Sequence, residues 1–164
     1  MQPIVKDQVY FEDAVVGTQL PSLVKGPVSL TTVVKFAGPS GDFAPIHHDI
    51  EVAKSRGLPG PIIMGPLKWA YLFQMITDWA GPQGVLQQIE FRLTQMDLVG
   101  DTLIAKGRMS RKYTDKGKNC VECDVWLENT KMDKPSIIGK ALVCLPSRNE
   151  KPPDGRGEHH SGKS

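Results

Sequence analysis

The longest helical pattern in the chain begins at Gly65-Pro66 and ends near Trp79, before the breaker Ala80-Gly81-Pro82. Proline fits the start of a helix because it forfeits only an amide that has no partner there. The segment PLKWAYLFQMITDW is apolar nearly all round, and its polar residues are Lys68 and a narrow stripe of Gln74, Thr77 and Asp78. A helix with so narrow a polar face must be enclosed by other structure. We expect a buried face formed by Trp69, Leu72, Phe73 and Ile76.

Four later segments show the patterns of strands. Residues 88–94, 102–110 and 121–128 alternate apolar with polar side chains, and a turn is expected at 115–118. Residues 137–145 are apolar on both sides, which predicts a central strand. Residues 17–25 predict one earlier strand. One strand, then helices, then four strands indicates an α+β domain, with an antiparallel sheet curled around one buried helix.

Two short helices are expected between the first strand and the long helix. Ser29 can cap a helix over 30–37, which Gly38-Pro39 would end. Asp49 can cap a second helix over 50–56, which Gly57 would end. The segment GDFAPIHHD, residues 41–49, connects the two.

Composition is that of a globular domain, with 164 residues, 40% hydrophobic and 23% charged. A net charge of +2 gives no reason to expect nucleic acid as a partner. No apolar run reaches the ~18 residues of a membrane span and the N-terminus lacks the apolar centre of a signal peptide, so we expect a cytoplasmic protein without membrane contact. Residues 146–164 have no large apolar side chain apart from proline, which predicts one domain over 1–145 and a disordered polar tail in which His159 and His160 are solvated.

The three cysteines do not predict a metal site. Cys120 and Cys123 differ by an odd number of positions, so on a strand their side chains point to opposite faces. Only Cys144 remains, and no further ligands complete a zinc site. We interpret all three as structural thiols.

The connecting segment carries the candidate chemistry. Asp42 and His47 stand on either side of Pro45, and a bent loop can turn both toward one point. A carboxyl beside an imidazole can run acid and base chemistry near pH 7 and can hold a water molecule. The alternative is that Asp42 caps the loop's own amides and His47 is a half-buried structural residue. We interpret His48 as structural and Asp49 as a helix cap.

The second candidate is Gly65, at the start of the long helix. An amide at the positive end of a helix can donate to an oxygen that gains negative charge. The other explanation is that glycine is required only for the turn. A further group of basic residues, Lys106, Arg108, Arg111 and Lys112, either meets the phosphates of a ligand or forms a solvated strand face.

The segments FAGPSGDFAPIHHD and PGPIIMGPLKWAYL resemble the hydratase signature of the MaoC-like proteins, which include (R)-specific enoyl-CoA hydratases and related dehydratases. The resemblance in element order covers about residues 10–145. It implies a hot dog fold in which dimers join two sheets. It also implies that Asp42 and His47 bind the water added across the 2,3 double bond of an acyl-CoA, that the Gly65 amide polarises the thioester carbonyl, and that no metal or cofactor is needed.

Two positions depart from the family pattern: Ala44 stands where Asn is usual, and Met64 where His is frequent. The departures put turnover in doubt and predict a wider, drier pocket for a bulky acyl group, with Ala44 and Met64 as substrate contacts. Arg108, from the basic group that could meet the CoA phosphates, is a third predicted substrate contact. The segment ITDWAGPQG is similar to small MaoC-like subunits that work in heteromers on steroid side-chain CoA esters. The alternatives are therefore a homodimeric hydratase, a non-catalytic or partner-dependent acyl-CoA-binding subunit, and, third, a hot dog thioesterase. A thioesterase would be expected to place a working carboxylate or hydroxyl on the long helix, and the carboxylate there, Asp78, lies in the last turn, far from Gly65.

Overall fold

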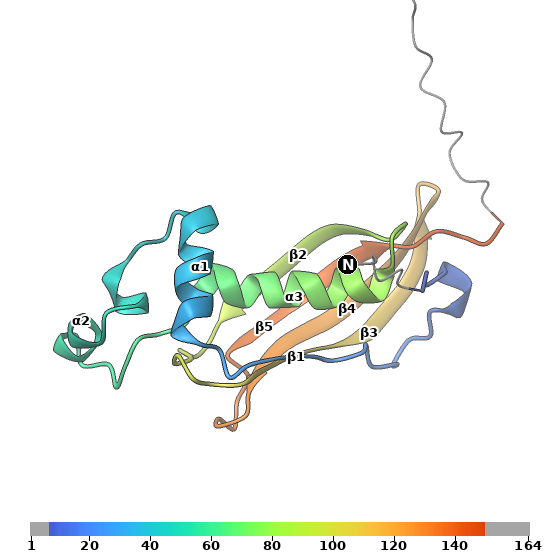
Figure 1. Ribbon diagram of the computed structural model, residues 1–164. Helices are drawn as coiled ribbons and strands as arrows, with labels where there is room; N and C mark the ends of the chain where they lie inside the picture. Colours follow the sequence, from blue (N-terminus) through green and yellow to red (C-terminus); the bar gives the residue numbers. More distant parts are fainter. Residues whose placement is uncertain (1–6, 150–164) are drawn as a thin grey trace, which may run out of the picture.

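One long helix lies against the concave side of a five-stranded antiparallel sheet (Figure 1). The computed structural model describes residues 7–149. Its helices are η1 (Phe11–Asp13), α1 (Leu30–Ser40), η2 (Pro45–His47), α2 (Ile50–Ser55) and α3 (Gly65–Ala80). Its strands are β1 (Leu23–Lys25), β2 (Val85–Leu93), β3 (Leu103–Asp115), β4 (Lys118–Asn129) and β5 (Ile137–Cys144). The predicted α+β architecture is confirmed.

The sheet has the strand order β1-β3-β4-β5-β2, and all neighbours are antiparallel. The turn expected at 115–118 joins β3 to β4, where Lys116 and Gly117 have positive φ angles of 47° and 79°. The hairpin is longer than the alternation predicted, because pairing continues to Asp115 and Lys118. β1 and β2 are the two edges of the sheet.

Helix α3 supplies the centre of the core. Leu72 and Ile76 are fully buried, as expected from the apolar face of the helix. Phe73, predicted to be buried with them, is 36% exposed, and its ring is tilted against that of Phe91, with ring centroids 6.2 Å apart. That part of the prediction is wrong because Phe73 faces the margin of the sheet, where β2 has no strand beyond it among the described residues.

The strand predicted over residues 17–25 is shorter in the structure. Regular pairing with β3 is confined to β1, although Leu20 donates its amide to the Gly107 carbonyl at 2.8 Å. Pro21 lies between these two contacts and has no amide to donate, so the ladder is interrupted there.

Helix α1 begins as predicted, with the Ser29 hydroxyl accepting from the Thr32 amide at 3.1 Å. It does not end at Gly38-Pro39 but continues to Ser40. Pro39 removes a single intrahelical bond, the Ser40 hydroxyl donates to the Phe36 carbonyl at 2.7 Å, and Gly41 ends the helix in the left-handed conformation at φ 68°. The predicted Asp49 cap of α2 is confirmed by bonds from the Glu51 and Val52 amides.

Strand β5 is internal but lies next to the edge strand β2, and β4 is the middle strand. On the outer face of β5, Ile138 is 39% exposed. The predicted opposite orientation of Cys120 and Cys123 is confirmed. Cys123 points into the core, and burial together with the neighbouring Asp124 raises its pKa to about 12. Cys120 lies on the other face, with its sulfur 3.8 Å from that of Cys144.

Residues 146–149, which were predicted to belong to the polar tail, contact η1 in the structure. Pro146 accepts from the Phe11 amide at 2.9 Å, and Arg148 pairs with Asp13, so residues 146–149 are held against η1. The remainder of the predicted tail, with His159 and His160, lies outside the described residues. No helix in residues 7–149 is long and apolar enough to cross a membrane.

Candidate active site

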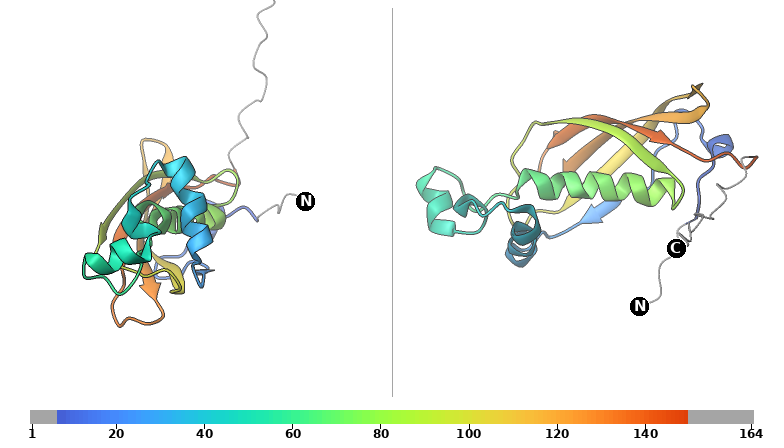
Figure 2. Two further views of the ribbon diagram at one scale, coloured as in Figure 1. Left: turned by 60° about the vertical axis from the view of Figure 1, so that its left-hand side comes forward. Right: turned by 90° about the horizontal axis from the view of Figure 1, so that it is seen from above.

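The loop between α1 and α2 lies at the end of the molecule where α3 begins (Figures 1 and 2). Its first turn follows the left-handed Gly41, and the 3-10 helix η2 then places His47 two residues after Pro45. The amide of Ile62 donates to the Ile46 carbonyl at 3.1 Å, which ties the loop to the segment entering α3. The loop is therefore held against the start of α3.

Asp42 and His47 face each other, as the sequence analysis predicted. Asp42 Oδ2 lies 3.5 Å from His47 Nε2, and the two side chains are 31% and 10% exposed. The other carboxylate oxygen, Oδ1, accepts the amide of Ala44 at 3.3 Å. His47 Nδ1 lies 2.8 Å from the carbonyl oxygen of Ile62. Each side chain therefore has one atom held by the backbone and one atom turned toward the other.

These contacts define the hydrogen-bonding capacity of the pair. A carbonyl oxygen only accepts, so His47 Nδ1 carries a hydrogen and the lone pair of the neutral ring is on Nε2. Two acceptors then face each other across 3.5 Å unless a proton lies on one of them. A water molecule beside the pair can donate one hydrogen to each and keep its oxygen lone pair available. The geometry suits the activation of water.

His47 and Gly65 line the same cavity, which has a volume of about 350 Å³. Its walls come from η2, the segment before α3, the first turn of α3, the last residue of β2 and the segment after β2. The lining residues are His47, Ile62, Ile63, Gly65, Lys68, Leu93, Thr94, Gln95 and Met96. A base and a helix N-terminal amide thus share one largely apolar space.

Gly65 is the first residue of α3 and is followed by Pro66, which has no amide hydrogen. In residues 7–149 no hydrogen bond from the Gly65 amide is found. Its φ angle is not positive, so the turn itself does not require glycine. A Cβ at this position would lie 3.4 Å from Leu93 Cδ2 and 3.6 Å from the Trp69 ring. The glycine leaves its amide accessible, which favours the interpretation as a donor over the turn explanation.

Sequence reasoning missed the contribution of the segment after β2. Lys68, which stands apart from the polar stripe of the helix in the sequence, is fully buried and donates to Asp97 Oδ2 at 2.8 Å and to the Gln95 carbonyl at 3.0 Å. Asn129 bridges Asp97 and Asp101, with both contacts at 2.8 Å. One signal in the sequence could have indicated this cluster: two acids four residues apart, Asp97 and Asp101, follow a strand. If such a segment is buried, its carboxylates need a cation as partner.

Three predicted substrate contacts lie apart from the cavity in the protomer. Ala44 contributes its amide to Asp42 and is not among the lining residues. Met64 is fully buried, with its sulfur 3.9 Å from the Ser40 hydroxyl. Arg108 lies on the outer face of β3, with the sheet between it and α3, and pairs with Asp124 at 3.9 Å. These positions do not support direct substrate contact by Met64 or Arg108 in one protomer.

The other three residues of the predicted basic group also have partners, and Lys112 lies on the core side of β3 opposite Val121. Lys106 pairs with Glu128 at 2.7 Å, Arg111 with Glu122 at 3.5 Å, and Lys112 donates to the Ala14 carbonyl at 3.0 Å. The hydrogen bonds from Lys106 and Trp126 lower the pKa of Glu128. This arrangement favours the solvated strand face over a phosphate site.

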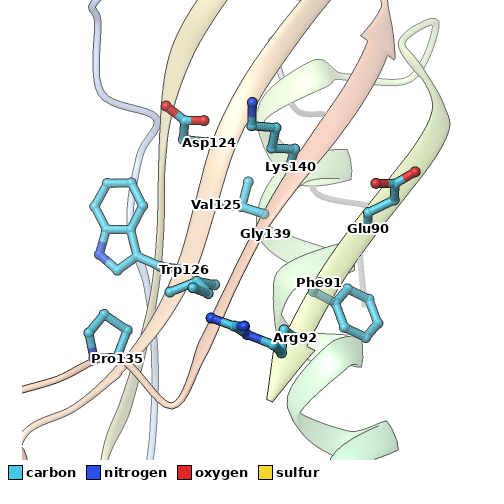
Figure 3. A pocket seen from close by; sticks show the side chains of 10 residues that line it. Glu90, Phe91, Arg92, Asp124, Val125, Trp126, Pro135, Gly139 and Lys140 are labelled. Atoms are coloured by element: carbon cyan, nitrogen blue, oxygen red, sulfur yellow. The ribbon is translucent and has the colours of Figure 1, made fainter. Parts of the chain in front are cut away.

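A larger hollow of about 700 Å³ lies on the outer face of the sheet and is remote from this chemistry (Figure 3). It is formed by β2, β4, β5 and the turn before β5, and charges of both signs surround Trp126 and Ile138. In Figure 3, Asp124 and Lys140 lie at one end of the hollow and Arg92 lies toward Pro135. It contains no imidazole or thiol, so we place the candidate active site at the smaller cavity.

The fold is that of known hot dog hydratases. The (R)-hydratase PhaJ1 from Pseudomonas aeruginosa superposes with a TM-score of 0.77 at 23% identity, covering 92% of this chain and 97% of that one. The (R)-hydratase from A. caviae gives 0.72 at 21% identity, with 82% and 99% coverage. The ChsH1-ChsH2 complex from Mycobacterium tuberculosis gives 0.70 at 24% identity, with 80% and 98% coverage.

Residues 12–130 match the MaoC like domain, and the chain belongs to the MaoC-like dehydratase family. Among characterised proteins, the beta subunit of 3-oxo-4,17-pregnadiene-20-carboxyl-CoA hydratase from Mycobacterium tuberculosis is similar. It is 30% identical over 96 residues, which are 58% of this chain and 74% of that subunit.

Proposed function

We propose that the protein is an (R)-specific enoyl-CoA hydratase that adds water across the 2,3 double bond of an acyl thioester, or removes it in reverse. The observation that carries the proposal is that Asp42 and His47 face each other at 3.5 Å while His47 shares its cavity with Gly65. The names of the two (R)-hydratases of the same fold support the stereochemical part of the proposal.

In the hydration direction, water is held between Asp42 and His47 Nε2, and its oxygen attacks C3 of the enoyl thioester. The pair takes one proton from this water, and C2 receives one proton from the pair, so the protein ends the cycle unchanged. Negative charge develops meanwhile on the thioester oxygen, where the Gly65 amide and the positive end of α3 stabilise it. Because the two side chains titrate as a unit, the proton belongs to the pair.

The substrate side of the cavity is apolar. Ile62, Ile63, Leu93 and Met96 contribute to its lining, and Met96 is 58% exposed at its rim. An apolar wall that continues into an exposed apolar side chain suits an acyl group larger than four carbons. If crotonyl-CoA is hydrated as fast as bulkier enoyl-CoAs, this preference is wrong.

The decisive experiment uses the purified protein with enoyl-CoAs from four carbons to steroid size. We expect hydration that depends on Asp42 and His47, and dehydration of (R)- but not (S)-3-hydroxyacyl-CoA. The variants Asp42→Asn and His47→Gln test the pair, and Asp49→Asn, which alters a carboxylate seven residues away that only caps α2, is the matched control. Unchanged turnover in both site variants would refute the proposal.

The second candidate is a subunit that turns over substrate only with a partner. It is favoured by the similarity to a chain described as a beta subunit and to a two-protein complex, and by the exposed apolar side chains beside the edge strand β2, where Phe73 and Leu93 are 36% and 45% exposed. We propose that a second copy or a related subunit pairs with β2 and closes the nearby cavity.

The molecular mass of the protein in solution tests whether two subunits pair through β2. Phe73→Lys places a charge beside the β2 edge and should shift the protein toward the monomer. Val24→Lys, at a more exposed position of the opposite edge strand β1, should not. A wild-type monomer that gains turnover only when a related subunit is added would favour the second candidate over the first.

A further inference from the structure

The buried ion pair of Lys68 and Asp97 lies between the two halves of the candidate site and has no role in the proposed reaction as written above. We propose that Lys68 and Asp97 are positioning residues that fix the Gly65 amide relative to His47. The inference rests on the proposed function and deepens it by assigning residues that hold the carbonyl donor in place.

Asp97 contacts the chain on both sides of Gly65. Its carbonyl accepts the amide of Ile63, two residues before Gly65, at 2.8 Å. Its carboxylate accepts the ammonium of Lys68, three residues after Gly65, at 2.8 Å. One residue therefore holds both flanks of the proposed donor.

The same segment also leads to His47. Ile62 pairs with Leu98, and Val99 donates its amide to the Pro61 carbonyl at 2.9 Å. The carbonyl of Ile62 in turn holds His47 Nδ1 at 2.8 Å. A continuous set of short contacts thus runs from the imidazole through Ile62 and Asp97 to the first turn of α3.

The far side of Asp97 is anchored in the sheet. Asn129, the last residue of β4, donates to Asp97 Oδ1 and to Asp101 Oδ2, and Lys131 pairs with Asp101 at 2.7 Å. The two lysines and two aspartates balance in charge. The network is rigid because Lys68, Asp97, Asp101 and Asn129 are all at least 98% buried.

Stability alone gives little reason for this arrangement. A lysine in the first turn of a helix is opposed by the helix dipole. A buried ion pair is often no more stabilising than apolar residues of similar volume, because both ions lose their hydration. A hydrogen-bonded ion pair can fix the geometry of the site, which an apolar pair does not do. The ammonium of Lys68 also adds positive potential beside Gly65.

The kinetic test compares Lys68→Met with Lys131→Met. Both remove one lysine from the same network, but Lys131 pairs with Asp101 and is mostly exposed. We expect Lys68→Met to lower kcat by about 10- to 100-fold with a much smaller change in KM, since a displacement of about 1 Å can cost about 100-fold. Lys131→Met should keep the wild-type kcat. A folded Lys68→Met protein with the wild-type kcat overturns the inference.

A spectroscopic readout separates positioning from general destabilisation. A saturated acyl-CoA labelled with carbon-13 at the thioester carbonyl is bound to each protein, and its carbonyl stretching band is measured by infrared difference spectroscopy. The wild type and Lys131→Met should shift the band to lower frequency, and Lys68→Met should lose most of the shift at saturating ligand. An equal shift in all three contradicts the inference.

The double variant Lys68→Met/Asp97→Asn removes the unpaired buried charge. The double variant should resist urea better than Lys68→Met but should not regain the wild-type kcat or band shift. Recovery of the wild-type kcat would mean that the ion pair serves only the fold. If Lys68→Met does not fold, Asp97→Asn carries the same test, because it keeps the main-chain carbonyl and an acceptor for Asn129.

Failure of the proposed function is distinguishable from failure of this inference. A wild-type protein that hydrates no enoyl-CoA refutes the hydratase, and amide hydrogen exchange in the unliganded protein then decides the positioning role. Lys68→Met should accelerate exchange at Ile63 well beyond Lys131→Met. Equal exchange rates at Ile63 in the two variants would overturn the positioning role.

Discussion

Two polar clusters flank the same cavity and are built in opposite ways. The Asp42–His47 pair is partly open to solvent, and its two side chains approach no closer than 3.5 Å. The cluster around Lys68 and Asp97 is closed, with contacts of 2.7 to 3.0 Å, and all of its members except Lys131 are almost fully buried. Both contain acids and bases within one network.

The comparison shows which cluster can still form hydrogen bonds to a ligand or to water. In the buried cluster each aspartate oxygen has a donor and the charges cancel, so no proton or water is needed. In the open pair the backbone satisfies one atom of each side chain and leaves two acceptors facing each other. An incomplete set of hydrogen bonds at a cavity is what a reaction with water requires, whereas a complete set gives rigidity.

The largest expected effect is on the open pair. Asp42→Asn and His47→Gln should each lower kcat about 100- to 10,000-fold, because each removes a proton acceptor from the attacking water. Initial rates with one enoyl-CoA and urea unfolding curves measure both properties. If either variant loses stability but not rate, the contrast between the clusters is wrong.

Breaking the closed cluster should mainly reduce the stability of the fold. Lys68→Met should cost about 3–5 kcal/mol of unfolding free energy, since it leaves Asp97 buried without its cation. Urea unfolding at pH 7 checks this value, with Asp42→Asn as the control that should change by less than about 1 kcal/mol. A loss below 1 kcal/mol in Lys68→Met would show that the pair is not enclosed.

The stability that Asp101 contributes to the closed cluster should depend on pH. Burial alone would raise its pKa, but hydrogen bonds from Lys131, the Leu98 amide and Asn129 outweigh burial and lower it. Its stabilisation is therefore present above the unfolded value of about 3.9 and is lost as the pH falls through the lower folded value. Asp101→Asn should cost about 1.5–3 kcal/mol at pH 7, and this difference should shrink below pH 4. A difference independent of pH would contradict the assignment.

The smallest effect is expected on the outer face of the sheet. Arg108 and Asp124 are 3.9 Å apart and half exposed, so Arg108→Ala should change stability by less than about 1 kcal/mol. It should also leave KM for an acyl-CoA unchanged, because the sheet separates it from the cavity. A several-fold rise in KM would instead support the predicted substrate contact, through a neighbouring subunit.

Much of the fold could be predicted because its signals are local. The enclosed α3, the alternating strands and the caps at Ser29 and Asp49 all follow from spacing along the chain. The boundaries that failed depended on details beyond the pattern. The Ser40 hydroxyl extended α1 past Pro39, and the position of β2 at the edge left Phe73 partly exposed.

By itself, the sequence determined that Asp42 and His47 lie in one bent loop before an enclosed helix, because a proline and two helix caps restrict that short segment. Only the tertiary structure decided which atoms of the pair face each other and that Gly65 shares a cavity with His47. It alone also brought Lys68 to Asp97, across 29 positions of the chain. Such contacts arise from the packing of separate elements, and neither periodicity nor spacing records them.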